Sequence, residues 1–140
     1  DSLAVGITED PAISRMTIVV EGDGYVIEQV TKQLNKLIEV IKVENISQDS
    51  VVRELALIKV HALPSTRNEI MQIANVFRAN IVDVSKNYLT IEITGDDQKI
   101  SAFVEMLDEF GIKEMVRTGV IAIDRGNKMI KVNNINSEEE

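Results

Sequence analysis

One segment of the chain occurs twice, and this repeat limits which folds the sequence can form. MTIVVEGDGYVIEQVTKQLNKL starts at Met16, and LTIEITGDDQKISAFVEMLDEF starts at Leu89. Each copy has an apolar run typical of a strand, then a Gly-Asp break, then apolar residues at helical spacing. Because 140 residues suffice for two small domains, the repeat predicts two related units in tandem, each with such a strand and helix.

The composition excludes several classes of protein. Apolar residues make up 44% of the chain and charged residues 27%, as in a globular protein with a core. The absence of cysteine rules out disulfide scaffolds, thiolate zinc sites and thiol nucleophiles, and it is compatible with the cytoplasm, where we expect the protein to work. A net charge of −8 and few aromatic residues argue against a nucleic-acid-binding surface. The apolar runs are also too short to cross a membrane.

The first half of the chain has the pattern strand, strand, helix, strand. Strands are expected at residues 2–8, 13–21 and 39–46, with turn residues between the first two. Asp23 is expected to cap the helix, because its carboxylate can accept hydrogen bonds from free backbone N–H groups. The expected apolar stripe of the helix is Val26, Ile27, Val30, Leu34, Leu37 and Ile38, and the last strand is expected to point Ile41 and Val43 inward.

The second half has the pattern strand, helix, strand, strand, helix, strand. A strand over residues 55–62 has apolar residues on both faces, as expected at the centre of a sheet. Thr66 and Glu69 have the spacing of a capping box at the start of the next helix. The remaining elements are a hairpin of residues 81–85 and 88–94, a helix that ends at Gly111, and one extended segment over residues 112–123.

The order of the second half is that of a ferredoxin-like βαββαβ unit. This is an α+β fold in which two helices cover one face of a four-stranded antiparallel sheet. The repeat makes the first half a second unit of this kind that lacks its first strand and helix. We therefore expect about 25 residues to be missing before Asp1, the length of one strand plus one three-turn helix. The expected domains are residues 1–47 and 51–128, followed by a tail over residues 129–140.

No residue pattern in the sequence supports a catalytic centre. His61 is the only histidine, lies on an expected strand without a metal-binding cluster near it, and is assigned a structural role. Asp49, Asp96 and Asp97 flank expected helices, where a carboxylate interacts favourably with the helix dipole. The segment 22–24 (GDG) lacks the lysine and the glycine spacing of a phosphate loop. An enzyme that uses acidic residues is therefore the least favoured interpretation.

Binding is the interpretation that the residues favour. In the first strand, Leu3, Val5 and Ile7 share one face and alternate with small residues. A sheet that is covered by helices on one side leaves its other face and its edges open. Another chain or an apolar ligand can dock on such a strand.

Several stretches resemble a known protein family. DSLAVGITEDPAISRMTIVVEGD and KQLNKLIEVIKV in the first half, with RELALIKVHA and FRANIVDVS in the second, closely resemble the small, regulatory subunit of acetohydroxyacid synthase, also called acetolactate synthase. The resemblance extends from Asp1 to about Lys128 and is most specific between Asp10 and Ile18.

The resemblance implies an amino-terminal ACT domain, which is an amino-acid-sensing ferredoxin-like module, and a second domain of related topology. It implies a homodimer whose ACT sheets pair side by side. Such a subunit has no catalytic centre and no cofactor of its own. It raises the activity of a separate catalytic subunit, which holds thiamine diphosphate, FAD and Mg²⁺, and makes that subunit sensitive to feedback by a branched-chain amino acid, usually valine.

The resemblance also indicates where the effector binds. In this family the groups that hold the charged ends of the effector lie upstream of the position of Asp1. Only Leu3 and Val5 are carried over as effector-binding residues, on the strand that closes the site from the dimer interface. A free-standing amino-acid-binding dimer without an enzyme partner stays open as the alternative.

Overall fold

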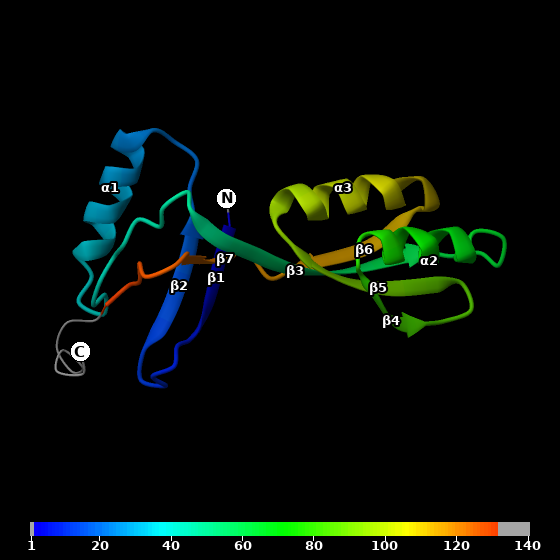
Figure 1. Ribbon diagram of the computed structural model, residues 1–140, viewed down its shortest axis with the longest axis horizontal. Helices are drawn as coiled ribbons and strands as arrows, with labels where there is room; N and C mark the ends of the chain where they lie inside the picture. The colour runs from blue at the N-terminus through cyan, green and yellow to red at the C-terminus, as the bar shows by residue number, and fades with distance from the viewer. Residues whose placement is uncertain (1, 132–140) are drawn as a thin grey trace.

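The computed structural model describes residues 2–131 as two lobes that are joined by one long strand (Figure 1). The first lobe contains β1 (Ser2–Ile7), β2 (Ser14–Val19) and α1 (Gly24–Asn35). Strands β1 and β2 form an antiparallel hairpin, in which Leu3 lies opposite Ile18 and Val5 lies opposite Met16. The hairpin lies between α1 and the second lobe (Figure 1).

The second lobe is a five-stranded antiparallel sheet with two helices. Its elements are β3 (Ser50–His61), α2 (Arg67–Val76), β4 (Asn80–Val84), β5 (Tyr88–Gly95), α3 (Asp97–Leu107), a 3-10 helix (Asp108–Phe110), β6 (Ile112–Arg117) and β7 (Ile121–Asp124). The strand order is β4-β5-β3-β6, and β7 pairs with the start of β3. Helices α2 and α3 lie on the same face of the sheet (Figure 1). The α+β class and the βαββαβ order predicted for this half are confirmed.

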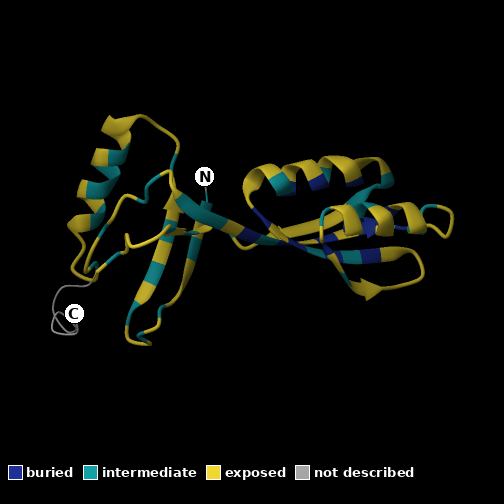
Figure 2. Cartoon of the chain, in the orientation of Figure 1, coloured by how far each residue is buried: buried dark blue, intermediate teal, exposed yellow. Residues whose placement is uncertain are grey.

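The hydrophobic core lies between this sheet and its two helices (Figure 2). Strands β3 and β5 direct alternate apolar side chains toward α2 and α3. The buried members are Ala56, Ile58, Val60, Ala62, Ile70, Ala74, Ala79, Leu89, Ile91, Ile93, Ile100, Phe103 and Leu107. Burial of one large apolar side chain contributes about 1.5–3 kcal/mol, so this cluster is the main source of stability in the second lobe.

Within residues 2–131 the first lobe has no comparable core, and one predicted strand does not form in it. Helix α1 buries none of its residues, and beyond its end Ile38 is 98% exposed. Residues 39–46 form no strand, so that prediction is wrong, and Ile41 is exposed rather than directed inward. Backbone groups form a strand only beside a neighbour that accepts and donates their hydrogen bonds. Among the described residues, β2 pairs with β1 alone and no strand lies beside residues 39–46.

Two predictions for the second half are also wrong. The extended segment 112–123 is interrupted, because β6 ends at Arg117 and Gly119 has a φ of 89°, which is the left-handed region that favours glycine. The capping box does not form, because Thr66 makes no side-chain hydrogen bond to α2. Its hydroxyl instead accepts a hydrogen bond from the Leu63 N–H and donates one to the Leu63 carbonyl.

The repeated segment forms the same local structure in both lobes. The Asp23 carboxylate accepts a hydrogen bond of 3.1 Å from the Val26 N–H at the start of α1, as predicted. The Asp96 carboxylate accepts one of 2.9 Å from the Lys99 N–H at the start of α3. Each copy is thus a strand, an Asp cap and a helix. Asp49 precedes β3 instead of a helix, so its predicted capping role is wrong.

Candidate functional site

One face of the β1–β2 hairpin is a continuous exposed apolar surface. Alternation in β1 places Leu3, Val5 and Ile7 on this face, and the strand register brings Met16 and Ile18 of β2 beside them. All five side chains are exposed. We call these five residues the apolar face. Contiguous exposed apolar surface of this kind marks a site for a ligand or for another protein.

The two residues predicted to bind an effector lie on the apolar face. Leu3 is 57% exposed and Val5 is 61% exposed. The structure therefore brings them together on one surface, in agreement with their predicted common face. Val5 also lines a groove beside the hairpin, whereas Leu3 lies against the second lobe through its backbone carbonyl. Their role as effector-binding residues stays a prediction.

The groove lies between the β1–β2 hairpin and the strands β3 and β7, and its volume is about 440 Å³. Ala4 and Thr17 line it from the hairpin, and Val51, Ile121 and Ile123 line it from β3 and β7. We call this space the interlobe groove. Its volume falls within the range of about 300–1,000 Å³ that is typical of small-molecule sites.

Two arginines line the interlobe groove. The Nη2 of Arg15, on β2, donates a hydrogen bond of 2.8 Å to the Ala122 carbonyl on β7. The Nη1 of Arg53, on β3, donates one of 2.8 Å to the Val52 carbonyl. Within residues 2–131, neither guanidinium forms an ion pair with a carboxylate, and no acidic side chain lines the groove. The groove is thus a local positive region in a chain with a net charge of −8.

The hairpin is anchored to the turn between β6 and β7. The Val120 N–H donates a hydrogen bond of 2.8 Å to the hydroxyl oxygen of Ser2. Gly119 lies so close to β1 that a Cβ at this position would be 2.5 Å from the Leu3 carbonyl oxygen. We call Ser2, Leu3, Gly119 and Val120 the junction. Only glycine permits both the positive φ and this close approach.

A charged cluster lies directly beside the junction. Glu54 on β3 is buried, and its carboxylate accepts a hydrogen bond from the Nε of Arg117 at the end of β6. The Nη2 of Arg117 donates another, of 3.0 Å, to Asp97 in the first turn of α3. The hydrogen bond to Glu54 raises the pKa of Arg117 above its usual value. Since these charges satisfy one another, the cluster fixes β6 against β3 and α3 and offers no free group for chemistry.

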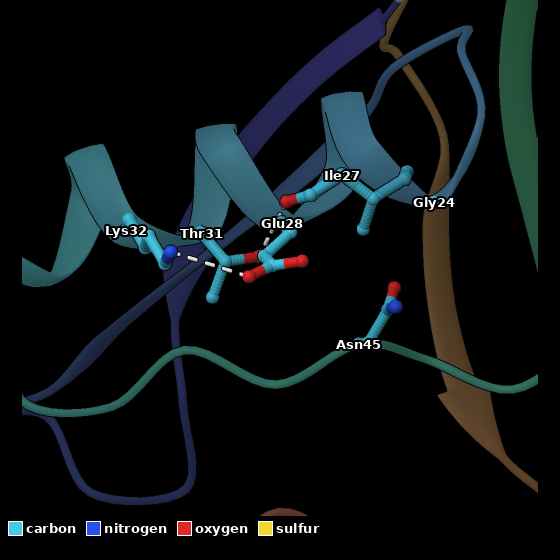
Figure 3. A pocket seen from close by; sticks show the side chains of 6 residues that line it. All are labelled: Gly24, Ile27, Glu28, Thr31, Lys32 and Asn45. Atoms are coloured by element: carbon cyan, nitrogen blue, oxygen red, sulfur yellow. Dashed lines mark hydrogen bonds and ion pairs between the residues drawn. The ribbon is translucent and has the colours of Figure 1, made fainter.

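A second hollow, of about 370 Å³, separates α1 from the segment that contains Asn45 (Figure 3). On α1, Lys32 and Glu28 form an ion pair of 3.2 Å, and the Thr31 hydroxyl donates a hydrogen bond of 2.8 Å to the Ile27 carbonyl. The polar groups of the helix at this hollow are therefore engaged within the helix itself. Asn45 points toward them from across the gap (Figure 3). The hollow has fewer convergent groups for a ligand than the interlobe groove.

Other chemical groups in residues 2–131 do not form a catalytic constellation. This part of the chain has no cluster of three or more His, Cys, Asp or Glu side chains that could hold a metal ion. The ring of His61 lies 5.6 Å from that of Tyr88, measured between centroids, in a tilted cross-strand pair. None of the described helices is long and apolar enough to cross a membrane.

Comparison with known families accounts for both lobes. The family described as "Small subunit of acetolactate synthase" matches residues 53–126. The chain belongs to this family. The family described as "AHAS small subunit-like ACT domain" matches residues 1–42, so the first lobe carries an ACT domain at its amino-terminal end. The resemblance inferred from the sequence is thereby confirmed.

Individual members of the acetolactate synthase small-subunit family are similar along most of their length. A probable acetolactate synthase small subunit from Archaeoglobus fulgidus is 59% identical over 128 residues, which cover 91% of this chain and 80% of the relative. The acetolactate synthase small subunit of Mycolicibacterium smegmatis is 52% identical over 130 residues, covering 92% and 76%. The crystal structure of the Thermotoga maritima small subunit aligns with a TM-score of 0.84 at 43% identity, covering 91% of this chain and 80% of the other.

Apart from residues of β1, sequence reasoning did not single out the residues that form the groove and the junction. Arg15 and Thr17 alternate with Met16, so the period of two could have placed them together on the opposite side of the hairpin. For Arg53 and Gly119 the sequence offers no such signal, because their positions beside the hairpin depend on how the two lobes meet.

Proposed function

We propose that the chain is the non-catalytic regulatory subunit of an acetolactate synthase. It raises the activity of a separate catalytic subunit, which supplies thiamine diphosphate, FAD and Mg²⁺. It also makes that subunit subject to feedback inhibition by a branched-chain amino acid, for which valine is our first candidate. The observation that carries this proposal is the match of small-subunit family members to both lobes, over residues 1–42 and 53–126.

The apolar face is our candidate surface for the effector. Leu3 and Val5 offer exposed branched side chains, against which the branched side chain of valine can pack. An effector changes activity only to the extent that it binds two states of the protein unequally. Couplings of this kind are typically about 1–3 kcal/mol, which corresponds to a change of about 5- to 150-fold in affinity.

We also propose that two copies of the chain pair through β1. In residues 2–131 this strand pairs with β2 alone, so its other edge presents unpaired backbone N–H and carbonyl groups. Pairing with the same edge of a second copy satisfies these groups and brings the two apolar faces into one continuous surface. The effector residues Leu3 and Val5 then lie at the dimer interface.

A further part of the proposal is that a strand and a helix preceding residue 1 complete the ACT domain. Among residues 2–131 the outer edge of β2 is unpaired, and residues 39–46 have an apolar alternation but no neighbouring strand. A strand inserted between them gives both a partner, and a helix beside α1 covers apolar side chains that are now exposed. The matched relatives are consistent with added length, because this chain covers 80% and 76% of two of them.

Extension of the chain tests this completion. With its natural preceding segment attached, we expect the amide protons of Ser14–Val19 and of residues 39–46 to exchange more slowly with solvent, because both segments gain strand hydrogen bonds. Amides in β5 serve as the internal control, since that strand is already paired on both sides. Unchanged exchange at both segments would contradict the insertion.

The regulatory role is tested by mixing the intact protein with its catalytic subunit and measuring acetolactate formation. We expect a rise in rate that valine reverses. The Val5→Ala variant should still activate but should need about 5-fold or more valine for half-inhibition, within the range of typical couplings. Val76→Ala, an exposed valine on α2, is the matched control and should leave the valine response unchanged.

Other results point to different functions. Failure to change the rate, combined with a dimer that binds valine alone, would replace the proposal with a free-standing amino-acid-binding dimer. Turnover of pyruvate by this chain without a catalytic subunit would contradict both interpretations.

A further inference from the structure

We propose that the interlobe groove is a second ligand site, which binds a small aliphatic carboxylate without an ammonium group. This inference goes beyond the proposed function, which places a branched-chain amino acid on the apolar face of the hairpin. The two sites are on the same hairpin but use different residues, apart from Val5 and Ile7, which belong to the apolar face and also line the groove.

The charge of the groove selects an anion. Arg15 and Arg53 each use one N–H donor on a backbone carbonyl, and a guanidinium has five such donors. Within the described chain no carboxylate neutralises either group. The fork of a guanidinium matches the two oxygens of a carboxylate, so a bound carboxylate supplies the missing acceptors.

The walls of the groove select an aliphatic body. Val51, Ile121 and Ile123 present branched apolar side chains from β3 and β7. Facing them, Ala4 and Gly6 of β1 have small side chains or none, which leaves room for a ligand. A ligand with a short branched chain therefore removes apolar surface from water on both sides, which inorganic phosphate cannot do.

The groove disfavours an amino acid. Among residues 2–131 no acidic side chain lines it, so the ammonium group of an amino acid would lie near two guanidinium groups without a counter-ion from this part of the chain. Thr17 lines the groove, and its hydroxyl has no hydrogen-bond partner among the described residues. A hydroxyl or carbonyl oxygen next to the carboxylate can bond to it. The ligand class that fits best is an aliphatic 2-hydroxy or 2-oxo acid.

The ligand would connect the two lobes. Arg15 belongs to β2 of the first lobe and Arg53 to β3, the strand that continues into the core of the second lobe. A carboxylate held by both fixes the hairpin, and with it the apolar face, relative to the second lobe. Binding in the groove should therefore influence effector binding and dimer pairing at the apolar face.

A series of matched ligands tests the site by calorimetric titration of the intact protein. The probes are 3-methylbutanoate, its 2-hydroxy derivative and its 2-amino derivative, which is valine. Inorganic phosphate and 3-methylbutan-1-ol serve as probes that lack the apolar body or the carboxylate. We expect the first two acids to bind at least 10-fold more tightly at the groove than phosphate or the alcohol.

Variants locate the binding. Arg53→Gln should weaken binding of the two acids at least 10-fold, because it removes one guanidinium whose only hydrogen bond within residues 2–131 goes to the neighbouring Val52 carbonyl. Arg78→Gln removes an exposed arginine from the second lobe, away from the groove, and should change nothing. Arg53→Lys keeps the charge but not the fork, so its affinity should fall between those of the unsubstituted protein and the Arg53→Gln variant. Circular dichroism before each titration establishes that each variant is folded.

Three results would overturn the inference. The first is binding of the acids that is equal in the Arg53→Gln and unsubstituted proteins. The second is no saturable binding of either acid. The third is valine binding that is as tight as that of 3-methylbutanoate and is lost with Arg53. None of these measurements uses a catalytic subunit. The ligand site in the groove can therefore be refuted while the regulatory role stands, and the regulatory role can be refuted while the ligand site stands.

Discussion

Replacement of Gly119 by alanine is expected to loosen the hairpin from the second lobe. At this position φ is 89°, and an added Cβ would lie 2.5 Å from the Leu3 carbonyl oxygen. Gly126 is the matched control, because its φ is also positive, at 67°, but its Cβ would meet nothing within 4 Å. The difference in unfolding free energy between the two variants therefore measures the effect of the close approach of β1 separately from that of backbone strain.

The expected cost of each substitution follows from these distances. A non-glycine residue with left-handed backbone costs about 1–2 kcal/mol, which applies to both variants. At Gly119 the Leu3 carbonyl must also withdraw, since an ordinary contact needs 3.4 Å or more. That movement breaks the bond between Val120 and Ser2, which contributes about 0.5–1.5 kcal/mol. Gly119→Ala should thus lower the free energy of unfolding by about 1.5–3.5 kcal/mol, and Gly126→Ala by about 1–2 kcal/mol.

Hydrogen exchange and denaturant unfolding together measure this effect. In Gly119→Ala, the amides of β1 and of Val120 should exchange about 2- to 10-fold faster, because 1.4 kcal/mol corresponds to a factor of ten. The amides of the β3–β5 pairs in the core should keep their protection. Equal exchange at β1 in the Gly119 and Gly126 variants would refute the reasoning, since only the contact with Leu3 distinguishes them.

Three further substitutions test the second lobe by urea denaturation. Phe103→Ala should cost about 3–5 kcal/mol, because it empties a fully buried site in the core, and a loss below about 1 kcal/mol would contradict that packing. Asp96→Ala should cost about 1 kcal/mol of unfolding free energy through loss of the α3 cap. Asp96→Asn should lose much less, because asparagine also caps helices, and equal losses in the two variants would argue against capping. Glu54→Gln should cost about 1 kcal/mol, because its bond to Arg117 loses charge assistance, and an unchanged midpoint would exclude that contribution.

The second lobe was predictable from sequence because its structure follows from local patterns. Alternation placed Leu89, Ile91 and Ile93 on the inner face of β5, and all three are buried. The helical spacing that includes Ile100 and Phe103 likewise identified the inner face of α3. Each of these apolar faces packs against another element within the same stretch of roughly 70 residues, which is long enough for a small domain. The interruption at Gly119 was not predictable, since glycine in an extended segment does not reveal which backbone approaches it.

The first lobe shows why a correct pattern can give a wrong element. Residues 39–46 alternate as a strand should, yet they form none, because a strand is a property of a pair and their partner is not among the described residues. The same reasoning explains why α1 has a capped start and a helical stripe but no buried residue. Local signals fix where a helix begins, whereas burial depends on the element that covers it. The two candidate sites depend on neighbouring elements in the same way. The apolar face is exposed because no described element covers it, and the groove with Arg15 and Arg53 forms where the hairpin meets β3 and β7. Candidate sites in this chain therefore follow from the contacts between its units, which periodicity within one unit does not encode.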